Sequence, residues 1–267
     1  MQPQILVVSD PPHGDVDIDA AAATLGLAVD MARLKVAFSA PEVLSASHQY
    51  RANEVADALT RTGMRVRVLD CAALAAVPWA IPVSSFAFGD RGLRVRGGGA
   101  ETEVPFDAPA LAVYCEPPEG FVAPFSRRTK GASEGLTLAE EVEWMPRLDL
   151  YYRRAGALER LGLVQGVTDF AGLGPAVGAD DLESLRFTVA ECRRRFTTLH
   201  LDARLEHVRP RQRFVMGETG FDIDLRKLYS FGTLLLRQVL DAVSPELRDL
   251  PQYELGSRMS CVLKPLR

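Results

Sequence analysis

The sequence has few of the residues on which familiar active sites and metal sites are built. Its 267 residues include four cysteines and four histidines, and aromatic residues make up only 7%. The cysteines, at positions 71, 115, 192 and 261, form no CxxC pair, which argues against a zinc knuckle or a thioredoxin-type motif. Widely spaced cysteines in a reducing compartment are instead expected to be small core residues.

Long apolar runs are also missing. No run approaches the roughly eighteen apolar residues of a membrane-spanning helix, and the best candidate, residues 69–82, contains Asp70 and two prolines. The first ten residues have no basic segment and only four consecutive apolar residues, unlike a secretory signal. We therefore expect a cytoplasmic protein without membrane insertion.

Motifs for nucleophilic catalysis and phosphate binding are absent as well. The sequence has no Gly-x-Ser-x-Gly elbow, no Gly-x-Gly-x-x-Gly and no Gly-Lys-Ser/Thr loop. His200 and His207 are seven residues apart, which is not the i, i+4 pair of a zinc protease. We predict no catalytic residue and no cofactor.

Two groups of alternating aspartates suggest a metal site at first sight. Asp15, Asp17 and Asp19 form one group, and Asp222 and Asp224 form the other. Alternating carboxylates can hold a divalent cation, but neither group has the further Gly and Glu of a calcium loop. Acids near a helix N-terminus contribute about 0.3–1 kcal/mol each, which accounts for the first group. We predict no metal site.

The charge balance gives no global attraction to nucleic acid or anionic lipid, because the net charge is −4 and the isoelectric point is about 5.7. Arginine greatly outnumbers lysine, as the codon bias of a GC-rich genome produces. One local cluster nevertheless makes an anion-binding segment possible. Its members are Arg193, Arg194, Arg195, Arg204, Arg209, Arg211 and Arg213.

The composition is that of a folded globular protein, with 47% hydrophobic and 25% charged residues. Residues 1–70 predict a small β-α-α-β-α-β domain. Residues 5–8 are an apolar strand, Asp17 or Asp19 caps a helix that ends near Gly26, and a second helix covers 29–38. A strand over 42–45, a helix over 49–61 and an alternating Arg/Val strand over 64–69 complete it.

This order resembles the C-terminal domain of the ribosomal stalk protein and the related ClpS adaptor fold, over roughly a quarter of the chain. The matching segments are Ile5-Leu6-Val7-Val8, Leu25-Gly26-Leu27 with Ala32-Arg33, Pro41-Glu42-Val43-Leu44, and residues 58–68. The resemblance implies a docking domain without catalysis. The ClpS family reads client N-termini with acids after the first strand and a histidine ending the second helix. Asp10 matches such an acid, but residues 36–38 contain no histidine, so that function is not carried over.

The remaining residues predict three further regions. An apolar linker over 71–82 leads into a β-meander over 83–118, with turns at 89–92 and 97–99. Residues 120–146 form an exposed connector, and 147–267 form a second α/β unit. That unit includes a helix capped by Asp180, a strand near 198–208, a further element starting at Phe221 and a long helix over 229–243. Whether the meander packs with this unit is left open.

These patterns favour a modular α/β (α+β) protein that acts as a protein–protein interaction or regulatory adaptor, with no partner identified and no oligomeric state defined. Binding of an anionic ligand or nucleic acid through residues 193–213 is the second hypothesis. The third is an enzyme whose site is assembled from Asp222, Asp224 and His200.

Overall fold

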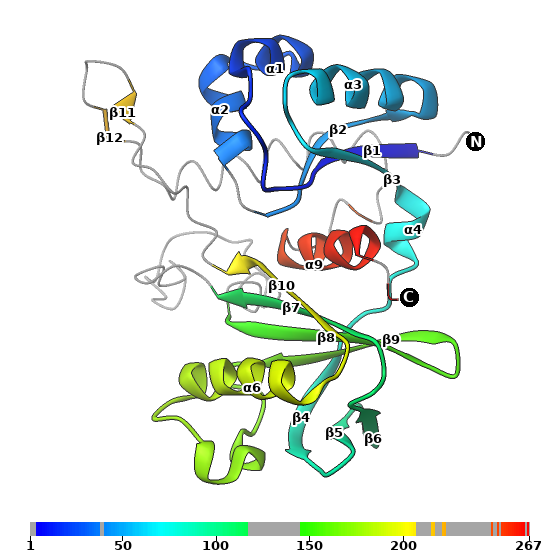
Figure 1. Cartoon of the computed structure of the whole chain (residues 1–267), viewed down its shortest axis with the longest axis vertical. Coiled ribbons are helices and arrows are strands. Elements are labelled where there is room, and N and C mark those ends of the chain that lie inside the picture. The colour runs from blue at the N-terminus through cyan, green and yellow to red at the C-terminus, as the bar shows by residue number, and fades with distance from the viewer. Residues whose placement is uncertain are drawn as a thin grey trace, which may run out of the picture. The chain divides into compact units, whose positions relative to one another are not determined.

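The computed structural model describes residues 4–37, 40–116, 145–206, 215–216, 221–222, 247, 250, 252–264 and 266. It confirms a mixed α/β fold. The chain divides into two compact units, unit 1 (Met1–Ala76 and Val208–Val262) and unit 2 (Val77–His207 and Leu263–Arg267) (Figure 1).

Unit 1 begins with the predicted β-α-α-β-α-β order. Its first strand lies in the centre of a three-stranded antiparallel sheet of order β2-β1-β3. The elements are β1 (Gln4–Ser9), α1 (Ile18–Leu25), α2 (Val29–Ala37), β2 (Glu42–His48), α3 (Gln49–Arg61) and β3 (Val66–Asp70). The central position of β1 follows from its unbroken apolar run, because a strand covered on both faces needs apolar side chains at every position.

Local signals define the ends of α1. The Asp17 carboxylate accepts a hydrogen bond of 3.0 Å from the N–H of Ala20, which settles the choice between Asp17 and Asp19 as the helix cap. Gly26 ends the helix in the left-handed region with φ of 64°. The predicted apolar face of α3 packs on one face of the sheet. The core there comprises Ile5, Val7, Ala21, Leu44, Ala52, Val55, Ala56, Leu59 and Met64.

Residues 71–82 are not the continuous linker that the sequence predicted. Asp70 ends β3 and caps the short helix α4 (Cys71–Ala75), accepting from the N–H of Ala72 at 2.8 Å. The C-terminal helix α9 (Gln252–Leu263) contacts α4, because Arg258 donates to the carbonyl groups of Leu74 and Ala75 at 3.2 and 3.3 Å. The prolines that indicated a linker lie after this helix, where they precede and enter the next strand.

Unit 2 contains a seven-stranded mixed sheet that combines the predicted meander with strands of the C-terminal region. The order is β10-β7-β8-β9-β4-β5-β6, with β10 parallel to β7 and β4 parallel to β9. The meander is therefore part of the larger sheet. The elements are β4 (Ile81–Phe88), β5 (Gly92–Gly97), β6 (Ala100–Pro105), β7 (Ala110–Glu116), β8 (Arg147–Arg154), β9 (Ala157–Val164), the 3₁₀ helix η1 (Ala171–Ala176), α6 (Asp181–Arg195) and β10 (Leu199–Glu206).

One face of this sheet forms the main core with α6 and η1. Asp180 caps α6 as predicted, accepting from the N–H of Glu183 at 2.8 Å. The helix contributes Leu185 and Cys192, and Phe196 follows directly after it. Burial raises the pKa of the Cys192 thiol to about 12, as expected for a cysteine that serves as a core residue.

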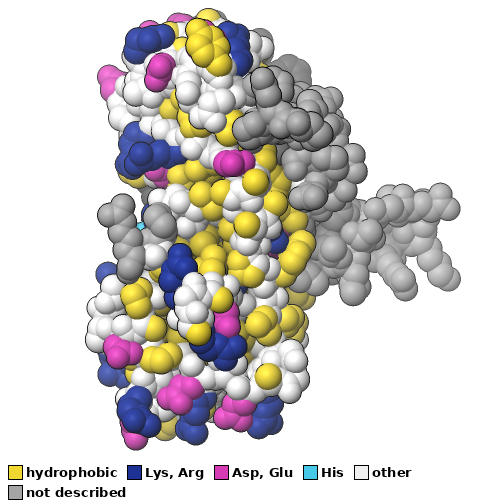
Figure 2. All heavy atoms as spheres, turned by 90° about the vertical axis from the view of Figure 1, so that its right-hand side faces the viewer, with side chains coloured by type: hydrophobic (Ala, Val, Ile, Leu, Met, Phe, Trp, Pro, Cys, Tyr) yellow, Lys and Arg dark blue, Asp and Glu magenta, His cyan; other side chains and the backbone are white. Residues whose placement is uncertain are grey.

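The outer face of the meander carries charge of both signs. Arg94 lies opposite Glu103, and Arg96 lies opposite Glu101, so each arginine of β5 has an acidic neighbour on β6. At the lower end of Figure 2, basic and acidic side chains alternate in the same way. These pairs leave little net charge on this surface.

Several predictions fall outside the described residues. These include the helix over 229–243 and nearly all of the connector over 120–146. The element predicted from Phe221 begins as the short strand β12 (Phe221–Asp222), which pairs with β11 (Val215–Met216). Within the described part of the chain, no helix is long and apolar enough to span a membrane.

Candidate functional site

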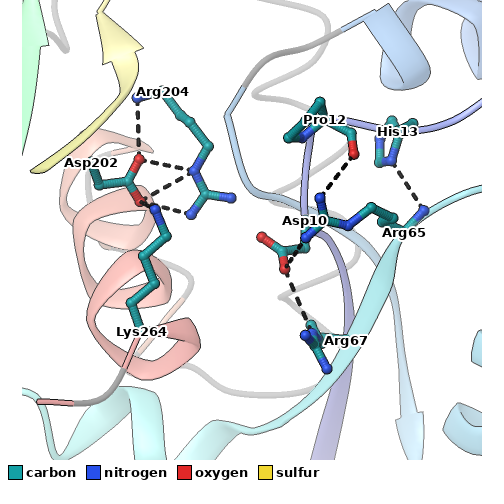
Figure 3. A network of polar contacts seen from close by, with 8 residues as sticks. All are labelled: Asp10, Pro12, His13, Arg65, Arg67, Asp202, Arg204 and Lys264. Carbon is teal, nitrogen blue, oxygen red and sulfur yellow. Dashed lines mark hydrogen bonds and ion pairs between the residues drawn. The ribbon is translucent and has the colours of Figure 1, made fainter. Parts of the chain in front are cut away.

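The first charged cluster lies where β1 ends in unit 1 (Figure 3). Asp10 is 8% exposed and sits 3.6 Å from the Nη2 atom of Arg65 and 3.6 Å from the Nε atom of Arg67. Arg65 immediately precedes β3 and Arg67 is its second residue, and their side chains are 54% and 63% exposed. Asp10, the residue that matched an acid of the ClpS family, is thus placed between two guanidinium groups.

His13 is held beside this cluster by the backbone of β3. Its Nδ1 atom accepts a hydrogen bond of 3.1 Å from the N–H of Arg65, so the ring proton of the neutral form is on Nε2. Burial and the positive charge of Arg65 lower the pKa of His13, and the negative charge of Asp10 acts in the opposite direction. A histidine kept neutral by its surroundings and used to bind the backbone has a structural role here.

The predicted binding triplet Arg193, Arg194 and Arg195 does end α6, but two of its members are already paired. Arg194 and Arg195 both contact Glu191, with closest distances of 2.7 and 2.9 Å. Arg195 also donates to the Gly89 carbonyl at 3.1 Å. Only Arg193 extends from the triplet without a recorded partner in the described residues.

The aromatic core of unit 2 holds Arg195 in place. Its guanidinium carbon lies 5.2 Å from the ring centre of Phe88 and 5.8 Å from that of Phe106. These are cation–π distances. The side chain therefore stabilises the end of α6 against the meander, which reduces its availability to an external anion.

The other predicted binding residues, Arg209, Arg211 and Arg213, lie outside the described residues. The hypothetical acidic site is described only in part. His200 is placed on β10, Asp222 is placed only through its backbone in β12, and Asp224 lies outside the described residues.

A second charged cluster, in unit 2, surrounds Asp202 on β10 (Figure 3). Arg204 contacts both carboxylate oxygens at 2.7–3.2 Å, and the Nζ atom of Lys264 is 3.3 Å away. Burial alone would raise the pKa of Asp202, but hydrogen bonds and positive charge from these two residues outweigh it and lower the pKa. Burial and the same cations lower the pKa of His200, which precedes Asp202 by two residues on the same strand. The carboxylate therefore serves as the centre of an ion-pair cluster.

A third cluster surrounds Asp149 on β8. Arg147 lies 3.0 Å from one carboxylate oxygen, and Arg160 of β9 pairs with the other. Asp149 and Arg160 have no exposed surface. Gly162 lies beside the cluster, and a Cβ atom there would be 3.1 Å from the Cβ atom of Ala80 and in ordinary contact, at 3.5 Å, with Arg147 and Asp149.

The fourth cluster fixes α6 to the sheet at the end of β7. Tyr114 donates to a carboxylate oxygen of Glu116 at 2.5 Å, and the Nε atom of Arg186 on α6 donates to the same oxygen at 3.0 Å. Burial and the hydrogen bond to Glu116 raise the pKa of Tyr114. Glu116 is 4% exposed, so this cluster also contains a buried carboxylate that is paired with an arginine.

Sequence reasoning missed the long-range pairings, such as Glu116 with Arg186 and Asp202 with Lys264, because their partners are far apart in the chain. It also missed the local pairs Arg147–Asp149 and Asp202–Arg204, whose spacing of two residues places both side chains on one face of a strand. The alternating Arg-Val-Arg-Val pattern over 65–68 did indicate a half-exposed strand, but it gave no sign that the strand lies at an edge of the sheet. Among the described residues, no group of three or more His, Cys, Asp or Glu side chains has the arrangement of a metal site.

No family model matches the chain, and comparisons with curated proteins and with solved structures found no match either.

Proposed function

We propose that the chain is a protein–protein interaction or regulatory adaptor. The observation that carries this proposal is the small sheet of unit 1, whose outer strands β2 and β3 both have no strand on their outer side among the described residues. Such an edge offers backbone N–H and C=O groups to an extended segment of another protein, a common mode of recognition.

The buried carboxylates of the described residues are engaged in ion pairs. The carboxylates of Glu116, Asp149 and Asp202 are each held by basic side chains, as are those of Glu42 and Glu254. A general acid or base works best with a pKa near the operating pH, whereas the basic side chains around Asp202 lower the pKa of that carboxyl group. These clusters therefore fit structural ion pairs.

The test is affinity capture from native lysate with the full-length chain, followed by quantitative mass spectrometry. A parallel sample is treated with nuclease, and a second bait carries Arg209→Ala, Arg211→Ala and Arg213→Ala. We expect the same protein to be enriched in all arms at a stoichiometry near one to one with the bait.

Recovery of nucleic acid that disappears with the arginine substitutions would favour the anion-binding hypothesis instead. Enrichment of no protein, together with a monomeric bait in size-exclusion chromatography, would contradict the adaptor proposal.

A further inference from the structure

The outer edge of β3 presents backbone N–H and C=O groups that point away from β1. The N–H of Arg65 donates to His13, and its carbonyl oxygen accepts from the N–H of Asp10 at 2.9 Å, so both backbone groups point towards the β1 side. Successive residues of a strand direct these groups to alternate sides. The N–H and C=O groups of Val66 and Val68 therefore point away from β1, and β3 has no further strand there among the described residues.

The side chains of β3 differ between its two faces. Val66 and Val68 pack against the core beneath α1 and α3. Arg65 and Arg67 lie on the opposite face, where they are more than half exposed. A segment added beside β3 would continue this alternation, with apolar side chains on the first face and acidic side chains on the second.

Among the described residues, the positive charge of this edge is only partly compensated. Asp10 is there the acidic partner of both arginines at 3.6 Å, beyond hydrogen-bond distance, and Arg65 also donates to the Pro12 carbonyl at 3.3 Å. Two guanidinium groups thus share one carboxylate, which leaves them able to contact a second acidic group.

The same arginines oppose pairing with a second copy of this chain. In an antiparallel dimer through β3 whose register places Arg65 opposite Arg67, or Arg67 opposite its own copy, like charges would face each other, which is destabilising. The charge therefore selects a partner of opposite sign.

We propose that β3 binds, by strand addition, an extended segment of a partner protein in which acidic and apolar residues alternate. This inference rests on the proposed adaptor function and names the edge and the partner chemistry. Since β3 has five residues, the bound segment is about five to seven residues long.

The direct test uses the full-length chain and two fluorescein-labelled ten-residue peptides, one of alternating Glu and Val and one of alternating Lys and Val. Fluorescence anisotropy at low ionic strength is expected to show saturable binding of the Glu/Val peptide alone. This comparison requires no substitution in the protein. Absence of saturable binding up to 0.5 mM protein, or equal binding of both peptides, would overturn the proposal.

Two variants locate the binding site. Arg65→Glu with Arg67→Glu is expected to weaken binding about tenfold or more, because two favourable cross-strand pairs become unfavourable. The matched control is Arg94→Glu with Arg96→Glu, the same alternating pair on β5, which has strands on both sides. A control that weakens binding equally would indicate unspecific charge attraction and contradict the proposal.

Val68→Pro tests strand addition itself. It removes an N–H group that points outwards and leaves the pairing with β1 intact, so circular dichroism should show a folded chain that has lost the peptide. Full affinity in this variant would rule out strand addition. Capture of the same protein partner by all of these variants would refute β3 as the site while leaving the adaptor function in place.

Discussion

The three consecutive arginines at the end of α6 are expected to differ sharply in what they contribute to stability. Arg195→Ala removes the hydrogen bond to Gly89, the ion pair with Glu191 and the contacts with two aromatic rings. Arg193→Ala, two residues earlier, removes an exposed side chain. The pair of variants is matched in residue type, in helix and in the charge that is lost.

The size of the difference follows from the contacts. A cation–π contact contributes about 0.5–1 kcal/mol, an exposed i, i+4 ion pair about 0.3–0.5 kcal/mol, and a charged hydrogen bond about 1.5 kcal/mol at the lower end of its range. Because the Arg195 side chain is 30% exposed and such terms overlap, we expect about 2 kcal/mol for their sum. For Arg193→Ala we expect less than about 0.5 kcal/mol.

Hydrogen exchange followed by mass spectrometry measures this difference locally, which suits a chain of two units. Peptides from α6 and β4 should exchange about 30-fold faster in Arg195→Ala, as 2 kcal/mol requires, and should change less than about threefold in Arg193→Ala. Arg195→Lys keeps the charge but loses the planar guanidinium group, so we expect an intermediate effect. Equal exchange rates in the two alanine variants would refute the assignment of a structural role to Arg195.

Three further predictions concern the backbone, a helix cap and pH. Gly172→Ala should prevent unit 2 from folding normally, because an ideal Cβ atom would lie 1.6 Å from the Phe86 carbonyl oxygen. Gly156 has open space around it and a φ of +84°, so Gly156→Ala should lower the free energy of unfolding by only about 1 kcal/mol, as measured by thermal denaturation. Asp180→Ala should lower the free energy of unfolding by about 1 kcal/mol and Asp180→Ser by much less, as measured in urea. The pKa of Asp202 is lowered in the folded chain, so the charged carboxylate stabilises the fold at pH values above the ordinary aspartate pKa near 4. This stabilisation is lost as the pH falls below about 4, and the difference in Tm between the native chain and Asp202→Asn should shrink there.

Local structure was largely predictable from the sequence, because it depends on neighbouring residues. The N-terminal element order, the range of α3, the Gly26 helix end and the Asp180 cap each follow from a short motif. Helix α4 was missed because the nearby prolines outweighed the capping signal of Asp70.

Pairing between distant segments was not predictable in the same way. The alternation over 198–208 indicates a strand, but nothing in it specifies that β10 lies parallel to β7, some ninety residues earlier. The open edge of β3 was not predictable from the sequence for the same reason. Arg65 and Arg67 are visible as an exposed pair in the sequence, whereas the open side of β3 is a property of the whole sheet.

Because unit 1 is built from two separate stretches of the chain, its parts are synthesised at different times. Unit 1 draws on two stretches, and all of Val77–His207 lies between them. As the chain leaves the ribosome, the sheet of β1, β2 and β3 can form early, because N-terminal segments emerge first. The carbonyl groups of Leu74 and Ala75 receive Arg258 only when α9 has been synthesised. Between these two events, unit 1 of the nascent chain lacks α9. During that time a chaperone or an early partner can bind the part of α4 that α9 covers in the finished protein.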